Sequence, residues 1–247
     1  MRKILKLAET EIRLFFREPQ AVFFTLAFPL MMLFLFGSIY GNEPAEFLGG
    51  FGFVDILIPS YTALIIATAG IMGLTISLAS YREQGILRRF QASPVTPLLL
   101  LIAESGVYLL MTVLGLVLLA AAGIFVFSIR CASSVIEITA AFILSCFSLF
   151  SLGFMLSSIT PTARSAHSTA MAVFFPMIFL SGATLPTEIL PEYVRQASQI
   201  LPLTHVVTLM RGLWTGHHLS SYFKEIIILV LSGTAATIIS VKTFRWK

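Results

Sequence analysis

The sequence has very little charge. Only 11% of its 247 residues are charged and 57% are hydrophobic, with a mean hydropathy of +0.93, whereas a soluble domain carries about 25% charged residues. This composition excludes an ordinary soluble protein and predicts an integral membrane protein. The alternating ten-residue segments typical of a membrane β-barrel are absent. We therefore expect an all-α membrane protein with one domain over residues 1–247.

Motifs for nucleotide, metal and acyl-transfer chemistry are absent as well. No Gly-x-x-x-x-Gly-Lys-Ser/Thr motif occurs, so the chain has no phosphate-binding loop of its own. Its histidines do not stand at metal-ligand spacing from Cys, Asp or Glu, and we expect structural or interfacial roles for them. They are His167, His205, His217 and His218. No Gly-x-Ser-x-Gly motif surrounds Ser181. We expect no catalytic residue, no metal and no cofactor.

Only two cysteines are present. Cys131 falls in a short loop and Cys146 near the middle of an apolar run, so we expect no disulfide between them. The first apolar run starts late, lacks a small-residue cleavage site and is long enough to span, so it does not resemble a secretory signal.

Uncharged runs divide the chain into candidate membrane spans, each of which needs about 20 helical residues. The runs are 19–42, 56–81, 105–129, 138–163, 165–187 and 226–241. The last run is short and needs the flanking aromatic residues Tyr222, Phe223 and Phe244. Lys224 and Lys242 then extend their charged ends toward water. We predict six transmembrane helices at about 20–41, 56–81, 105–129, 138–160, 165–186 and 222–243.

The basic residues are distributed unevenly between the two sides. With a cytoplasmic N-terminus, twelve Lys and Arg residues fall inside and four outside, which is the positive-inside bias. The outer ones are Arg130, Arg195, Arg211 and Lys224. We therefore expect cytoplasmic N- and C-termini in a multi-pass protein of the cytoplasmic membrane. The net charge of +4 is then explained by the orientation of the chain in the membrane, and we expect no nucleic-acid partner.

Three segments outside the main spans have special patterns. Residues 1–18 form a basic amphipathic stretch, which predicts an interfacial helix ended by Pro19. Residues 186–210 contain three prolines and the uncharged stretch 196–210, which predicts a re-entrant hairpin on the outer side. In the second span, Ala69, Gly73 and Ser77 lie four apart, and this spacing fits either intramolecular packing or a dimer seam.

The polar loop between the second and third spans is the densest group of charges. If one helix continues through Gly85, then Glu83, Ile86, Leu87 and Phe90 share one stripe. This short amphipathic helix would end before Pro94 and could fit a groove on a soluble partner. The alternative is an ordinary inner loop that is basic only because of its topology. Glu104 and Arg164 lie near inner span ends, where we expect them to reach toward water.

The same loop carries a resemblance to a known family. Residues 82–95, REQGILRRFQASPV, resemble the coupling-helix signature of type-2 ABC transporter permeases. FLSG at 179–182, the following prolines, LPLT at 201–204 and FREP at 16–19 also resemble that family, so the likeness covers essentially the whole chain. Ile86 and Glu104 depart from the family pattern, in which threonine and a basic residue are common.

The resemblance implies a permease subunit of an ABC exporter, which is not itself an enzyme. Its partners would be separate ATP-binding subunits, a second permease copy or paralogue, and membrane lipids. The ATPase would dock on residues of the polar loop, namely Arg82, Glu83, Gln84, Gly85, Leu87, Arg88, Arg89 and Phe90. The substrate and its binding residues are not implied.

Two other classes stay open as alternatives. A secondary, ion-coupled carrier needs charge inside the spans and repeat symmetry, and neither is evident. An intramembrane enzyme needs polar groups that converge within the spans, whereas the Ser, Thr and Tyr residues there are scattered.

Overall fold

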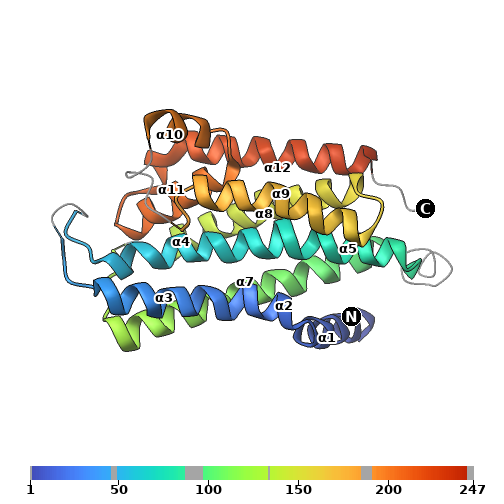
Figure 1. Cartoon of the computed structure of the whole chain (residues 1–247), viewed down its shortest axis with the longest axis horizontal. Helices are drawn as coiled ribbons and strands as arrows, with labels where there is room; N and C mark the ends of the chain where they lie inside the picture. The colour runs from blue at the N-terminus through green and yellow to red at the C-terminus, as the bar shows by residue number, and fades with distance from the viewer. Residues whose placement is uncertain (1, 46–48, 87–96, 133, 185–190, 244–247) are drawn as a thin grey trace.

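The computed structural model describes residues 2–45, 49–86, 97–132, 134–184 and 191–243. Within these ranges every regular element is helical. The long helices run side by side along the longest axis of the molecule (Figure 1). Helix α1 and the C-terminal end of α12 lie at one end of this bundle, and α10 and α11 lie at the other (Figure 1). We name these the α1 end and the α10 end.

The first two apolar runs are each interrupted by a π-helical turn. The elements of the first are α2 (Pro19–Val22), the π-helix η1 (Phe23–Ala27) and α3 (Phe28–Tyr40). Those of the second are α4 (Phe53–Ala67), the π-helix η3 (Thr68–Leu74) and α5 (Thr75–Glu83). Short π-helical segments inside longer helices are uncommon and frequently mark functional sites.

The remaining helices are distributed along the rest of the chain. They are α1 (Arg2–Arg17), α7 (Pro97–Phe127), α8 (Val135–Ile159), α9 (Ala163–Leu180), α10 (Glu192–Ser198), α11 (Pro202–Trp214), the 3-10 helix η5 (Leu219–Tyr222) and α12 (Phe223–Thr243). Helix α1 ends just before Pro19, and α7 begins at Pro97 because proline is accommodated in the first turn of a helix.

Five helices in the described ranges are long and apolar enough to cross a membrane. They cover Pro19–Tyr40, Phe53–Glu83, Leu101–Phe127, Val135–Ile159 and Leu219–Thr243. They overlap five of the six predicted segments in sequence, and the spans themselves stay a prediction. The 18-residue α9 is not among them, since its first turns carry Arg164, Ser165, His167 and Ser168, so a sixth span stays a prediction.

The second apolar helix, α4–η3–α5, is the centre of the bundle, and most of its side chains are buried. It packs so closely on α8 that a Cβ built on Gly153 would lie 2.0 Å from the carbonyl oxygen of Gly70. The Thr75 hydroxyl donates to the Gly153 carbonyl at 3.1 Å across the same crossing. Gly73 faces the ring of Tyr108 on α7, so at this position the small-residue stripe serves intramolecular packing.

A buried carboxylate closes the α10 end of the bundle. Asp55, which is fully buried, accepts hydrogen bonds from the Asn42 side chain at 3.1 Å and from the backbone N–H groups of Gly52 at 2.9 Å and Arg130 at 2.8 Å. Asn42 also accepts the Asp55 N–H at 3.1 Å and donates to the Phe127 carbonyl at 3.1 Å. We call this network the Asp55 cap. It joins the ends of the first, second and third apolar helices.

The predicted hairpin region contains two helices, α10 and α11. Pro202 stands at the start of α11, and most of α11 is buried, because it packs against α4, α8 and α12. The Arg211 guanidinium donates to the Ser60 hydroxyl at 2.6 Å and to the Gly182 carbonyl at 2.7 Å. Helix α11 is therefore tied both to α4 and to the segment that follows α9.

Candidate functional site

The first residues of the predicted docking loop hold the turn between α8 and α9. The Arg82 guanidinium donates to the carbonyl oxygens of Ser157, at 2.9 Å, and Thr160. Glu83 accepts the backbone N–H of Ala163 at 2.7 Å. A cation thus stands at the C-terminal end of α8 and an anion at the N-terminal end of α9, which are the signs that the two helix dipoles favour. We call this arrangement the turn clamp.

The condition for the predicted stripe is not met, because helix α5 does not continue through Gly85. Helix α5 ends at Glu83, Gln84 occupies the C-cap, and Gly85 has a φ of 68°, the left-handed conformation that ends helices. The exposed Gln84 donates to the Ser80 hydroxyl within its own helix at 2.7 Å. The other predicted docking residues, Leu87, Arg88, Arg89 and Phe90, lie outside the described residues.

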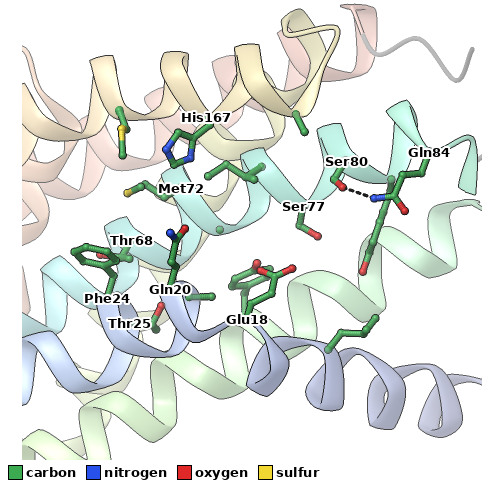
Figure 2. Close-up of a pocket in the computed structure, with 18 of the residues that line it drawn as sticks. Glu18, Gln20, Phe24, Thr25, Thr68, Met72, Ser77, Ser80, Gln84 and His167 are labelled. Atoms are coloured by element: carbon green, nitrogen blue, oxygen red, sulfur yellow. Dashed lines mark hydrogen bonds between the residues drawn. The ribbon is translucent and has the colours of Figure 1, made fainter.

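Beside α5 lies a cavity of about 540 Å³ toward the α1 end, which we call the polar chamber. Its walls come from α1, α2 and η1 on one side, η3 and α5 behind, and α9 on the other side (Figure 2). Polar groups extend into it from several elements, including Glu18, Gln20, Thr25, Ser77 and His167 (Figure 2). Such convergence of polar groups within an apolar bundle is typical of a ligand site.

A second carboxylate lies directly behind the polar chamber. Glu104 on α7 is only 4% exposed. Its oxygens accept from the Ser77 hydroxyl at 2.5 Å and from the Tyr81 hydroxyl at 3.4 Å, and both of these side chains line the chamber. We expected Glu104 to reach toward water, and that expectation is wrong, because hydroxyl groups of α5 hold it inside the bundle. Arg164, by contrast, is exposed.

A second cavity of about 350 Å³ continues from the first toward the α10 end. The two share Phe24, Thr68, Met72 and Met171, so they form one groove between the first apolar helix and α9. The second cavity, which we call the aromatic chamber, is lined mainly by phenylalanine and methionine. Its aromatic residues are Phe24, Phe28, Phe36, Tyr61, Phe174, Phe175 and Phe179.

One polar group in the aromatic chamber has no partner among the described residues. Tyr61 is 1% exposed and lines the chamber, and its hydroxyl makes no hydrogen bond within the described part of the chain. An unpaired buried hydroxyl costs free energy comparable to a lost hydrogen bond, so such a group in a native protein calls for a specific explanation.

The π-helical turns lie where the two chambers meet. Residues Phe24 and Thr25 belong to η1, and Thr68 and Met72 belong to η3. Sequence reasoning missed this groove, although Gln20 and Thr25 in the first apolar run and His167 in the fifth were signals of it. Within the described ranges, no three His, Cys, Asp or Glu residues are close enough to hold a metal ion.

Helices long and apolar enough to cross a membrane surround a groove with a polar end and an aromatic end, which are the features of a membrane protein with a candidate ligand site. The chain belongs to the ABC-2 type transporter family, whose family model matches residues 2–214. The resemblance carried by residues 82–95 is therefore confirmed at the level of the family.

Two of the reported relatives are similar over most of this chain, and a third over about a quarter of it. The "Probable multidrug ABC transporter permease YbhR" of Escherichia coli K12 is 28% identical over 186 residues, covering 73% of this chain and 50% of that protein. "Inner membrane transport permease YhhJ" of the same strain is 26% identical over 200 residues, covering 79% and 51%. "Nodulation protein J" of Rhizobium leguminosarum bv. trifolii is 34% identical over 67 residues, 27% of this chain. The chain spans about half the length of YbhR and YhhJ.

Proposed function

We propose that this chain is the permease subunit of an ABC exporter, with separate ATPase subunits that dock on residues 82–94. Two permease chains form the pathway, and the α1 end faces the cytoplasm. The positive-inside bias supports this orientation, because Arg2, Lys3, Lys6, Arg13 and Arg17 all belong to α1. The chain itself hydrolyses no ATP, since it contains no phosphate-binding loop.

The turn clamp is the observation that carries the mechanism. It connects the start of the docking loop to Ala163 at the first turn of α9, and α9 forms one wall of the groove. When closing ATPase subunits push residues 87–94, the clamp passes the displacement to α9. Among the described residues, no hydrogen bond or ion pair joins the opposite wall, α2 to α3, to the clamp, so the groove changes width. Both walls pack against α4–η3–α5. Helix α8 packs closely on that helix where Gly70 and Gly153 approach each other.

The lining of the groove is evidence for two parts of the proposal, the pathway and the dimer. Gln20, Thr25 and His167 line the groove, Gln20 is exposed, and polar groups exposed to lipid are costly. A second permease copy that faces the groove removes them from lipid and encloses a path between the two chains. Phe175 and Phe179 on α9 are exposed apolar residues at the edge of the same groove.

The predicted sixth span and outer hairpin complete this architecture. Helix α9 crosses the membrane as the fifth span, with its polar first turns facing the groove rather than lipid. Helices α10 and α11 re-enter the bundle from the outer side, which is supported by the burial of α11 and by the contacts of Arg211 with Ser60 and Gly182.

A second candidate function, an ion-coupled carrier, is favoured by one observation. Glu104 is a buried acid within an apolar helix, and such groups often belong to proton or ion pathways. Proteoliposomes that contain the chain and the ATPase encoded beside it separate the two functions. The ABC exporter requires ATP and fails with an ATPase variant that cannot hydrolyse it. Transport that needs only an ion gradient would establish the carrier instead.

Docking on the polar loop has its own test. Reversing the charge of Arg88 and Arg89 together should weaken co-purification of the ATPase, and Phe90→Ala should remove an anchor that costs about 2 kcal/mol or more at an interface hot spot. Both variants should insert into the membrane normally. If both retain full transport and a full complement of ATPase, the loop is only a topology signal.

A further inference from the structure

The aromatic chamber lies between two walls of aromatic rings. On one wall, formed by the first apolar helix, the ring centroids of Phe24 and Phe28 are 5.9 Å apart. On the other wall, formed by α9, the rings of Phe175 and Phe179 are stacked at 6.4 Å with an interplanar angle of 17°. Among the described residues, no ring of one wall pairs with a ring of the other. The cavity of about 350 Å³ that both walls line is large enough for a small organic molecule.

Two separate aromatic walls suit an aromatic ligand. Aromatic rings attract each other in offset-stacked or edge-to-face arrangements at centroid separations of about 4.5–7 Å. A flat ring system in the chamber can make such contacts with both walls at once, whereas an acyl chain makes only apolar contact with them. The chamber therefore favours an aromatic molecule over an aliphatic one.

Helix α4 supplies the chamber with one hydrogen-bond donor. The polar side chains in the described lining are Tyr61, Thr68 and Thr184. The hydroxyl of Thr68 donates to the Leu64 carbonyl at 2.8 Å, and that of Thr184 donates to the Ile178 carbonyl at 3.2 Å. Of the three hydroxyls, only that of Tyr61 makes no hydrogen bond within the described part of the chain. A carbonyl or ether oxygen of a ligand would accept from it and remove the cost of leaving it unpaired.

We propose that the aromatic chamber binds a flat aromatic molecule that carries a carbonyl or ether oxygen. The rings of the ligand lie between the two phenylalanine walls, and its oxygen accepts a hydrogen bond from Tyr61. This inference rests on the proposed permease function only in taking the groove as the substrate path, because binding itself requires no ATPase.

The test compares two probes of nearly the same shape. Fluorene and fluorenone share one flat three-ring framework, but only fluorenone has a carbonyl oxygen. Each radiolabelled probe is titrated onto the purified chain in lipid nanodiscs without nucleotide, binding to empty nanodiscs is subtracted, and affinities refer to the probe concentration in the lipid. Both probes should bind saturably, and fluorenone should bind about threefold to tenfold more tightly, which is the contribution of one neutral hydrogen bond. Equal affinities, or no saturable binding of either probe, overturn the inference.

The variant Tyr61→Phe separates the hydrogen bond from packing. It keeps the ring and removes only the hydroxyl, so the affinity for fluorenone should fall to that for fluorene, which stays unchanged. The infrared carbonyl band of bound fluorenone should lie at lower frequency in the unmodified chain than in the variant, because a hydrogen bond weakens the C=O bond. An equal loss for both probes, or the same carbonyl band in both proteins, overturns the inference.

The matched control is Tyr40→Phe. The Tyr40 side chain is exposed and does not line the chamber, so this variant should bind both probes like the unmodified chain. A loss of fluorenone affinity in this control as large as that in Tyr61→Phe would place the hydrogen bond outside the chamber and overturn the inference.

The stability of ligand-free Tyr61→Phe gives an independent check. Because the Tyr61 hydroxyl is buried and unpaired, its removal should leave the thermal unfolding temperature unchanged or raise it. A hydroxyl with a structural hydrogen bond would show the opposite, since breaking that bond lowers stability. A lower unfolding temperature in the variant, or failure to fold, therefore overturns the inference that Tyr61 is available to a ligand.

The place of the ligand rings is tested on the α9 wall. Phe175→Leu removes one ring of the chamber and should weaken the binding of both probes about twofold to tenfold, as expected for the loss of one aromatic pair. Phe125→Leu is the matched control, since Phe125 on α7 is exposed and does not line the chamber, and it should bind normally. Unchanged affinity in Phe175→Leu would mean that the probes lie elsewhere, which overturns the inference.

The outcomes for binding and for transport are separable. Saturable, Tyr61-dependent binding of fluorenone without ATP-driven transport supports the inference and rejects the exporter function. ATP-driven transport by a chain that does not distinguish fluorenone from fluorene rejects the inference alone.

Discussion

Breaking the turn clamp should separate ATP hydrolysis from transport. Arg82→Met keeps the apolar stem of the side chain but removes the donors to the Ser157 and Thr160 carbonyls. Glu83→Ala removes the acceptor of the Ala163 N–H. Neither change touches the groove lining or the described part of any apolar face, so the bundle itself should assemble.

The size of the effect follows from the bonds that are lost. A hydrogen bond to a charged group contributes about 1.5–3 kcal/mol when buried. Because Arg82 is half-buried and Glu83 is exposed, we expect about 1–2 kcal/mol from Arg82 and about 1 kcal/mol from Glu83, including its interaction with the α9 dipole. The double variant therefore loses about 2–3 kcal/mol of coupling, more than a tenfold factor.

The assay is the amount of substrate moved per ATP hydrolysed in proteoliposomes that contain the ATPase. The double variant keeps the docking residues Arg88, Arg89 and Phe90, so the ATPase that still co-purifies is quantified, and transport per ATP hydrolysed should fall at least tenfold. Arg164→Met is the control, since it removes an exposed arginine from the first turn of α9, and it should transport normally. Unchanged transport per ATP in the double variant would refute the argument that the clamp carries the displacement to α9.

The other predictions concern packing and topology. Asp55→Asn should lower stability by about 2–4 kcal/mol, because its amide donor would face the N–H groups that Asp55 accepts, and thermal unfolding in detergent measures this. Gly153→Ala should lower stability by about 1–3 kcal/mol or prevent folding, since the new methyl would meet the Gly70 carbonyl. An impermeant maleimide applied to intact cells should label the exposed Cys131 and spare the buried Cys146.

Each of these three predictions has either a matched control variant or an outcome that would contradict it. Glu43→Gln removes an exposed acid close to the Asp55 cap in sequence and should leave stability unchanged. Gly106→Ala should be neutral or slightly stabilising, because nothing lies within 4 Å of its new Cβ. Labelling of Cys131 only in opened cells would reverse the proposed orientation.

The long helices could be predicted from local sequence. The thickness of a bilayer requires long uncharged runs, and these runs are visible between the charged residues. The start of α7 at Pro97 and the end of α1 before Pro19 depend on the chemistry of single residues, so both were predictable. The turn clamp was not, because Arg82 and Ser157 are 75 residues apart and meet only through the packing of α5 on α8.

Glu104 shows the same limit at the candidate site. A charge near the end of an apolar run can reach water or enter the bundle, and the run itself does not distinguish the two. The hydroxyl of Ser77, 27 residues earlier in the chain, decides the outcome here. The stripe through Gly85 failed for a local reason, since a glycine that can be helical adopts a φ of 68° at this turn.

The Asp55 cap has a consequence for engineering the α10 end of the bundle. Asn42 and Gly52 touch, so both ends of the intervening loop are pinned side by side, and the loop also closes through Ala45 N–H and the Phe51 carbonyl at 3.1 Å. A segment whose ends are already adjacent can be lengthened cheaply, since each doubling of a flexible loop costs only about 0.6 kcal/mol. A fluorescent domain or an affinity tag inserted between Ala45 and Gly50 should therefore leave the bundle intact, which makes this loop a permissive fusion site.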